Sequence, residues 1–115
     1  MYLEEVLMTE QEISIILEKQ RRFFSTGTTI PVDFRLAQLK KLKAAMTRHE
    51  QDLHLALKKD LGKSRMESYM CEVGLTLSEL TWMQKHLRSL AREKRVPTPL
   101  AQFAARSFRS PSPYG

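Results

Sequence analysis

The chain has 115 residues, of which 42% are hydrophobic and 28% are charged, and its formal net charge at pH 7 is +6. This length fits one domain at most, and the apolar content favours a folded chain over a disordered one. A single cysteine excludes a disulfide framework, the acidic N-terminus lacks the bases of a secretory signal, and no apolar run could span a membrane. We therefore expect a soluble, cytoplasmic protein.

A short amphipathic helix is predicted over residues 9–26. Thr9 and Glu12 have the T-x-x-E spacing of a capping box, in which each side chain satisfies a free backbone N–H, and Gly27 ends the segment. The side chains that follow helical spacing are Ile13, Ile16, Leu17, Gln20, Phe23 and Phe24. We expect this face to pack on a core.

The longest predicted helix spans residues 31–61. Its start is marked by Pro31 near the first helical position, and its end by Gly62. Steps of three and four place one series on a single face: Leu39, Leu42, Met46, Leu53 and Ala56, with His49 in one place of the series. A helix of this length needs partners along all of it.

A third helix is predicted over residues 64–94, directly after a tight turn. Ser64 and Glu67 form a second capping box. The heptad-like series comprises Met66, Met70, Val73, Leu77, Leu80, Gln84, Leu87 and Ala91. Because the turn is short, we expect this helix to lie antiparallel to the second, as a long hairpin.

The third helix also carries a second apolar series, formed by Cys71, Leu75 and Trp82. A helix that is apolar on two sides is expected to be buried on two sides. Gly74 lies in mid-helix, where it costs about 1 kcal/mol relative to alanine unless another backbone passes close by. Both features indicate that a further element packs on the third helix, in addition to the second helix. The first helix is one candidate.

The residue pattern changes after residue 95, where helical spacing ends and prolines become frequent. Pro97 and Pro99 end the helix, and Ala104–Ser110 is expected to form one extended strand with no strand to pair with. The predicted fold class is therefore all-α, with three helices and a short C-terminal strand. The helical region covers residues 1–95, and a proline-rich linker with the single strand covers residues 96–115.

The charge is concentrated at the C-terminal end. Seven basic residues lie from Lys85 onward, where the only acid is Glu93, so this last quarter carries the whole net charge of +6. A basic end fits nucleic acid, an acidic membrane surface, or an acidic part of the same protein. Because no aromatic–basic interleaving accompanies it, we expect neither a nucleic acid nor a membrane partner.

Candidate catalytic groups are few. His49, His54 and His86 lack metal-ligand spacing, and the carboxylate four residues before His54 is Glu50, whereas diiron bundles place it three residues before the histidine. Cys71 could be a nucleophile, but it fits better as a small buried hydrophobe on a helix face.

Paired carboxylates and phosphate-binding loops add nothing to this set. Glu4–Glu5 and Glu10/Glu12 sit on an exposed N-terminus, and neither a G-x-G-x-x-G segment nor a phosphate loop is present. The sequence therefore predicts no catalytic, cofactor-binding or metal-binding residue in this chain.

Four short segments carry a family resemblance. They are RFFSTGTTIP (Arg22–Pro31), FRLAQLKKL (Phe34–Leu42), DLGKS (Asp60–Ser64) and YMCEVG (Tyr69–Gly74), followed by the tail RSPSPYG. In this order and spacing they resemble the N-terminal region of NAD(P)-dependent aldehyde dehydrogenases, closest to the class 3-like and fatty-aldehyde branch. The tail departs from the family pattern at Ser112, where the family usually has glutamate.

The resemblance implies a parent enzyme that oxidises aldehydes to carboxylic acids with NAD(P), through a cysteine thiohemiacetal and hydride transfer. In that family the cofactor loop, general-base glutamate and nucleophilic cysteine come later, so none falls within residues 1–115. The N-terminal helices cover the cofactor domain, and the strand near Ala104–Ser110 joins the sheet that holds subunits together.

We therefore expect an N-terminal fragment of an aldehyde dehydrogenase that is not catalytic by itself and forms homo-oligomers through exposed apolar faces. Its other partner would be the remainder of the dehydrogenase. The first alternative is a free-standing helical interaction module that associates through its apolar stripes. The second is a basic nucleic-acid binder that uses the C-terminal end.

Overall fold

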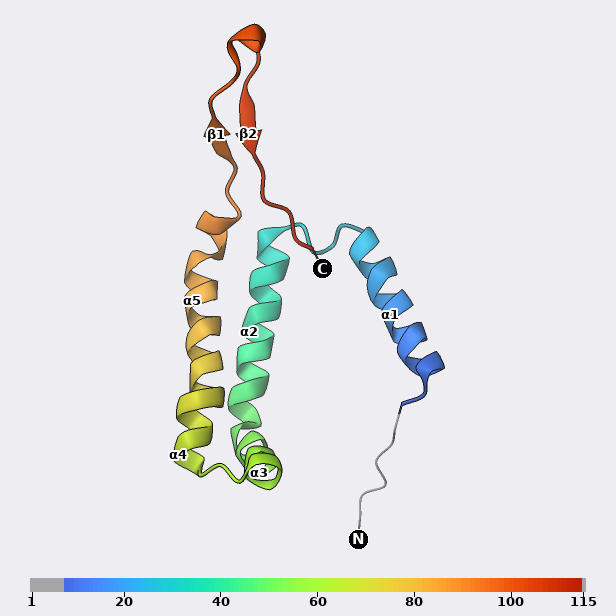
Figure 1. Cartoon of the computed structure of the whole chain (residues 1–115), viewed down its shortest axis with the longest axis vertical. Coiled ribbons are helices and arrows are strands. Elements are labelled where there is room, and N and C mark those ends of the chain that lie inside the picture. The colour runs from blue at the N-terminus through green and yellow to red at the C-terminus, as the bar shows by residue number, and fades with distance from the viewer. Residues whose placement is uncertain (1–7, 115) are drawn as a thin grey trace.

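A computed structural model describes residues 8–114 (Figure 1). The elements in chain order are α1 (Glu10–Ser25), α2 (Val32–Arg48), α3 (Glu50–Leu61), α4 (Arg65–Ser68), the π-helical turn η1 (Tyr69–Val73), α5 (Gly74–Leu90), β1 (Lys94–Val96), the 3-10 turn η2 (Leu100–Gln102) and β2 (Ser107–Arg109). Because α4, η1 and α5 follow one another without a break, they form one helical rod. Within the described residues, four helical segments and a two-stranded sheet replace the expected three helices and one strand.

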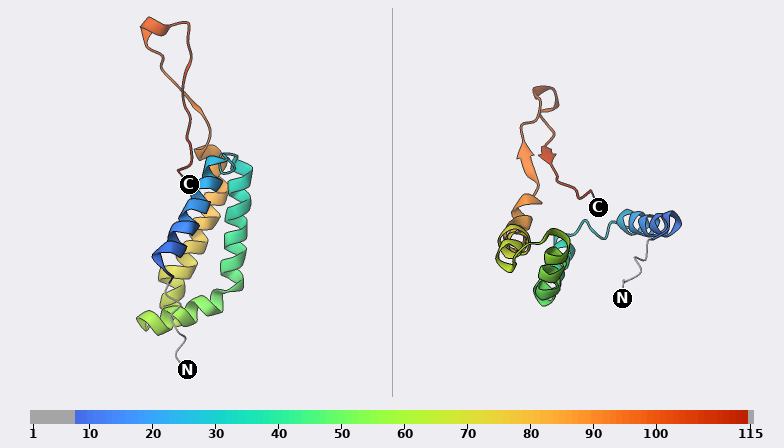
Figure 2. Two further views of the ribbon diagram at one scale, coloured as in Figure 1. Left: turned by 90° about the vertical axis from the view of Figure 1, so that its right-hand side faces the viewer. Right: turned by 60° about the horizontal axis from the view of Figure 1, so that its bottom comes forward.

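The expected continuous helix over residues 31–61 is wrong, because the chain breaks at His49. This residue has φ −102° and ψ 19°, which lies outside the α-helical range, and it both ends α2 and precedes α3. As a result α3 leaves the axis of α2 and runs across the lower end of the molecule (Figure 2).

Charges on either side of His49 explain the break. Arg48 lies in the last turn of α2, whereas Glu50 and Asp52 lie in the first turn of α3. A base at one helix end followed by acids at the next start suits the dipoles of two helices better than that of one. His49 Nδ1 also lies 3.0 Å from Asp52 Oδ2, across the first turn of α3.

The antiparallel pairing of the fold is made by α2 and α5. The two helices lie side by side and run in opposite directions (Figures 1 and 2). Two polar contacts join them: Lys43 Nζ donates to Thr81 Oγ1 at 2.8 Å, and Arg88 forms an ion pair with Asp33. The hairpin is therefore shorter than expected, because its first arm ends at Arg48.

The buried apolar core is small. Among residues 8–114, Val73 and Leu80 are the apolar side chains with almost no exposure, at 3% and 7%. The expectation that Met66 and Met70 join the same seam is wrong, because both are largely exposed. A π-helical turn holds more residues than an α-helical turn, so the side chains before η1 are rotated relative to a regular helix.

This rotation brings Ser68 inward in place of the two methionines. Ser68 has 0% exposure and precedes Val73 by five residues, which is a step that no regular α-helix would place on one face. The seam was predicted from the spacing of a regular α-helix. Because the helix contains a π turn, the residues predicted for the seam before Val73 were wrong.

Gly74 directly follows the π turn, and contacts with Tyr69 explain why a glycine occupies this position. A Cβ at this position would lie 2.7 Å from the Tyr69 carbonyl oxygen and 2.8 Å from Cε1 of the Tyr69 ring. The expected close approach is therefore real, but it comes from Tyr69 in the same rod and not from a second backbone.

The C-terminal region forms a projecting arm. The two strands are antiparallel, with Lys94 opposite Arg109, Arg95 opposite Phe108 and Val96 opposite Ser107. The expectation of one unpaired strand is wrong, because α5 ends at Leu90 and leaves residues 94–96 free to pair. Thr98 Oγ1 accepts a hydrogen bond from Ser107 N at 3.1 Å and so supports the reversal of the chain.

Helix α1 stands apart from the hairpin. Its capping box is confirmed, but none of its residues is buried. The ring centroids of Phe23 and Phe34 are 6.1 Å apart, at the junction with α2. Leu75 and Trp82 on α5 are about half exposed, so the expected burial of this second face is wrong for the chain as it stands.

Replacing Leu80 with aspartate is expected to destabilise the fold by about 3 kcal/mol or more, because a carboxylate would enter the small core. The thermal midpoint measured by circular dichroism tests this. Glu79→Ala, at an adjacent exposed position, is the matched control. An unchanged midpoint for Leu80→Asp would contradict the placement of Leu80 in the seam.

Gly74→Ala is expected to destabilise the chain by about 1–3 kcal/mol, because Tyr69 already occupies the space of the new methyl group. Helix propensity alone gives the opposite sign, a stabilisation of about 1 kcal/mol. Urea unfolding distinguishes the two outcomes. In a Tyr69→Ala background the penalty should shrink, because the ring is gone, and a stabilising Gly74→Ala would refute the steric argument.

Candidate functional site

The strongest cluster of polar side chains lies at the corner between α3 and the helical rod. His54 is 5% exposed, and its Nδ1 is hydrogen-bonded to Ser68 Oγ. Its Nε2 lies 3.4 Å from Glu50 Oε1. The Tyr69 ring closes one side, with ring centroids 6.4 Å apart.

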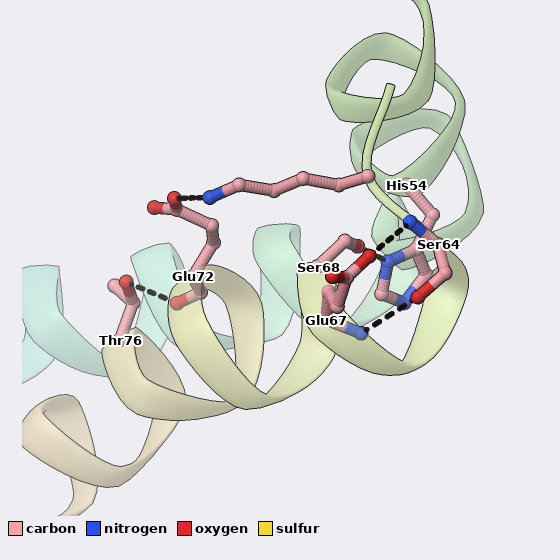
Figure 3. A network of polar contacts seen from close by, with 7 residues as sticks. His54, Ser64, Glu67, Ser68, Glu72 and Thr76 are labelled. Carbon is pink, nitrogen blue, oxygen red and sulfur yellow. Dashed lines mark hydrogen bonds and ion pairs between the residues drawn. The ribbon is translucent and has the colours of Figure 1, made fainter. Parts of the chain in front are cut away.

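Local sequence signals position these groups. Glu50 and His54 are four residues apart on α3, so they share one face. Gly62 has φ 67° and ends α3 in the left-handed conformation, which glycine adopts without strain. The capping box of Ser64 and Glu67 then starts α4 and delivers Ser68 to His54 one turn later (Figure 3).

Charged groups brace the same corner. Lys63 forms an ion pair with Glu72, and this hydrogen bond raises the pKa of the lysine above its usual value. Hydrogen bonds from Ser64 N and Oγ lower the pKa of the Glu67 carboxyl. Because this carboxyl pKa is lowered by folding, the cap stabilises the fold at neutral pH, and that contribution is lost as the pH falls through the lowered pKa.

The Ser68–His54–Glu50 arrangement resembles the hydrogen-bonding order of a serine hydrolase but cannot act as one. When Glu50 is ionised, it selects the tautomer in which Nε2 donates, so that Nδ1 accepts from the Ser68 hydroxyl. A nucleophile must reach its substrate, yet Ser68 has 0% exposure. The cluster therefore serves to join α3 to α4.

A hollow of about 560 Å³ opens beside this corner. It is lined by basic side chains, including Lys58, Lys63 and Arg65. The backbone N–H groups of Ser64 and Glu67, which could hold an anion at a helix start, are already used by the capping box. Within residues 8–114, no group of three or more potential metal ligands is found.

The other sequence candidates are scattered. His86 Nδ1 lies 2.7 Å from the Trp82 carbonyl oxygen, and the His86 ring stacks on Trp82 at 4.3 Å. Cys71 is exposed, so the expectation that it is buried is wrong for the described chain. Of all the predicted candidates, Glu50 and His54 are the two that the fold brings into one cluster.

The paired carboxylates are not catalytic neighbours. Glu12 belongs to the capping box of α1, where hydrogen bonds from Thr9 lower its pKa, and Glu10 lies in the same exposed turn. Glu4 and Glu5 lie outside the described residues. The spacing in the sequence did not indicate Ser68, because a five-residue step from Ser68 to Val73 lies on one face only when a π turn separates the two residues.

Comparison with known proteins places the chain in context. The model of the aldehyde dehydrogenase family matches residues 4–115. The chain is 40% identical to the 4,4'-diaponeurosporen-aldehyde dehydrogenase of Staphylococcus aureus over 95 residues, which are 83% of this chain and 21% of that enzyme. It is 37% identical to human aldehyde dehydrogenase family 3 member B1 over 86% of the chain and 21% of that protein.

A solved structure agrees with these matches. The substrate-bound state of Staphylococcus aureus AldH superposes on the chain with a TM-score of 0.81 at 37% identity, covering 85% of this chain and 21% of that one. The chain thus spans about a fifth of the length of the relatives it matches and corresponds to their N-terminal part. No helix within residues 8–114 is long and apolar enough to cross a membrane.

Ser68→Ala is expected to cost about 1–3 kcal/mol, because it leaves a buried ring nitrogen of His54 without its partner. Urea unfolding measures the loss, and Ser78→Ala at an exposed position of α5 is the control. A double-mutant cycle with His54→Ala should give a coupling of about 1 kcal/mol or more. Additive effects would mean that the two side chains do not depend on each other.

Proposed function

Because the chain belongs to the aldehyde dehydrogenase family, we propose that it forms the N-terminal helical part of an enzyme that oxidises aldehydes to carboxylic acids. The observation that carries this proposal is the superposition on Staphylococcus aureus AldH, with a TM-score of 0.81. Since the chain covers a fifth of such enzymes, the reaction is assigned to the whole enzyme and not to these residues.

The cofactor of the whole enzyme is proposed to be NAD or NADP. One relative, the canine enzyme, is named the dimeric, NADP-preferring aldehyde dehydrogenase and is 37% identical over 79% of this chain. The described residues themselves do not fit a dinucleotide. Gly27 and Gly62, which have positive φ, each lie between two helices, whereas a dinucleotide fingerprint places its glycines between a strand and a helix.

The proposed role of the helices is to cover and support the rest of the enzyme. The polar corner at His54 fixes the angle between α3 and the helical rod, so the hairpin and α3 present their outer faces in a set orientation. Exposure of Leu75 and Trp82 supports a packing role for the face of α5 that points away from α2.

The β1–β2 arm is proposed to join subunits. It extends beyond the helices, and each of its strands has an open edge in the described chain (Figure 1). Open edges offer unpaired N–H and C=O groups to a further strand. Phe108 on β2 is half exposed and would supply an apolar contact in such a sheet.

A free-standing interaction module is the second candidate function, favoured by the many exposed apolar side chains of α1 and α5. The two candidate functions predict different behaviour of the chain. A module binds partners by itself, whereas a dehydrogenase segment restores a catalyst when it is joined to the remainder of a related enzyme.

A chimera tests the proposal. Residues 13–114 would replace the matching N-terminal segment of the Staphylococcus aureus enzyme, and absorbance of the reduced cofactor would follow aldehyde oxidation. We expect the chimera to be active, because the two segments share fold and sequence, and the free 115-residue chain to be inactive.

Two further results define the limits of this test. The same chimera carrying Leu80→Asp should lose activity, since its helices no longer pack. A folded but inactive chimera would contradict the proposal, and so would turnover by the free chain that disappears in a Cys71→Ser variant.

A further inference from the structure

The β1–β2 arm is too small a sheet to be stable by itself. Each strand has three residues, and the ladder ends at Val96 and Ser107, with residues 97–106 forming the connection. A two-stranded hairpin is marginally stable at best in water, whereas a third strand with an apolar contact stabilises it. The arm therefore needs a further strand, and its own residues indicate the chemistry of that strand.

The arm carries a strong excess of positive charge. Between residues 92 and 109, five cations stand against one anion, which gives this segment a net charge of +4. The charged residues of the segment are Arg92, Glu93, Lys94, Arg95, Arg106 and Arg109. Within residues 8–114, none of these six side chains forms an ion pair. The described part of the chain thus leaves the positive charge of the arm unbalanced.

The strand register places two of these cations directly opposite each other. Lys94 pairs with Arg109 across the ladder, so their side chains stand on the same face of the sheet. Opposite residues have Cβ atoms about 5 Å apart, and like charges at such a pair destabilise the pairing of the strands. Glu93 lies outside the ladder and does not separate the two cations. An acidic group on this face would remove the repulsion that opposes the hairpin.

The two outer edges of the arm differ in chemistry. β1 has Lys94 and Arg95 in succession, and charged side chains, especially lysine, commonly keep an edge strand from pairing. Its apolar residue, Val96, is half-buried beside the connection. In β2, by contrast, the half-exposed Phe108 is the central residue and is followed by Arg109. An added strand gains an apolar contact at the centre of β2, so β2 is the edge that suits a further strand.

A strand beside β2 would place one residue next to Arg109 and the following one next to Phe108. Side chains on neighbouring strands that lie opposite each other share one face of the sheet. The residue beside Arg109 therefore shares the face of the Lys94–Arg109 pair, where a carboxylate is attracted to both cations. Its neighbour lies on the other face beside Phe108, where an apolar side chain is favoured. The pattern that suits β2 is thus an alternation of acidic and apolar residues.

We infer that β2 pairs with an extended strand of alternating acidic and apolar residues, which the remainder of the dehydrogenase supplies. The source of this strand rests on the proposed function, in which the arm joins subunits. Its chemistry rests on the register and the charges of the arm itself.

A protein strand suits the arm better than nucleic acid does. A phosphate backbone would neutralise the cations, but it has no strand edge, so the outward N–H and C=O groups of β2 would stay without a partner strand. It also offers Phe108 no apolar side chain. An acidic strand satisfies the charge, the open edge and the apolar residue together.

Two synthetic peptides test the chemistry on the 115-residue chain. The peptide TVEVEVT has the alternating pattern, and TVKVKVT has the same length and apolar residues with lysine in place of glutamate. We expect fluorescence anisotropy to show about tenfold tighter binding of TVEVEVT at low salt, and a smaller difference at about 1 M salt, where the charges are screened. The largest amide shifts in NMR spectra should fall in Ser107–Arg109, which would locate the peptide on β2.

Arg109→Glu separates binding of the strand from formation of the hairpin. Because it puts opposite charges across the ladder, amide hydrogen exchange in β1 and β2 of the free chain should become slower. The same variant should bind TVEVEVT about tenfold more weakly, because the acidic side chains now repel each other. Arg106→Glu is the matched control, since it makes the same change of net charge outside the ladder and should alter the affinity by less than about twofold.

Three results would overturn the inference. They are equal affinity for the two peptides, equal effects of Arg109→Glu and Arg106→Glu, and tighter binding of random duplex DNA than of TVEVEVT. In each of these cases the cations of the arm do not select an acidic strand.

The chimera with the Staphylococcus aureus enzyme tests the source of the strand. In an active chimera, Arg109→Glu should lower the thermal midpoint by a few degrees more than Arg106→Glu does, and equal midpoints would show that the dehydrogenase does not supply the strand. A folded but inactive chimera would contradict the proposed function, whatever the peptides show. An active chimera without the preference for TVEVEVT would contradict this inference and leave the proposed function intact.

Discussion

The π-helical turn at Tyr69–Val73 sets the register of everything that packs on the helical rod. It places Ser68 and Val73 on the same side, although they are five residues apart. Ser68 can then reach His54 on α3, while Val73 and Leu80 remain on the side that faces α2. Without the extra residue in this turn, either the polar corner or the apolar seam would lose its partner. Gly74 makes the turn possible, because no other residue leaves room for Tyr69.

The corner at His54 is held by polar contacts in a chain with little apolar core. A buried histidine with partners on both ring nitrogens fixes direction as well as proximity, since each hydrogen bond constrains the plane of the ring. The break at His49 and the turn at Gly62 leave the orientation of α3 to these contacts. The same small region therefore fixes how α2, α3 and the rod present their outer faces.

Local signals in the sequence were sufficient for the starts and ends of several helices. The capping boxes at Thr9 and Ser64 are confirmed, and so is the left-handed stop at Gly62, because each depends on residues within one turn. The order and spacing of four short segments were enough for the family. The break at His49 was missed, since the apolar series continues across it, although the sequence Arg48-His49-Glu50 carried the signature of a helix end and a new start.

The sequence indicated part of the polar cluster at His54. The four-residue spacing of Glu50 and His54 was noticed as a possible metal-ligand pattern. The same spacing also allows a hydrogen bond between the two side chains, and that is the contact they make. Ser68 could not be added, because its position depends on the π turn and on the chain folding back through Gly62. The pairing of β1 with β2 was also out of reach, since each strand has three residues and the pattern of so short a strand is weak.

The small core determines how this chain would respond to denaturants and to heat. A denaturant acts in proportion to the surface that unfolding newly exposes, and the heat capacity change follows the apolar part of the same surface. A chain that already exposes 10220 Å² in its folded form has little more to expose. Its dependence on urea concentration is therefore shallow, its stability curve against temperature is flat, and its unfolding is spread over a wide range.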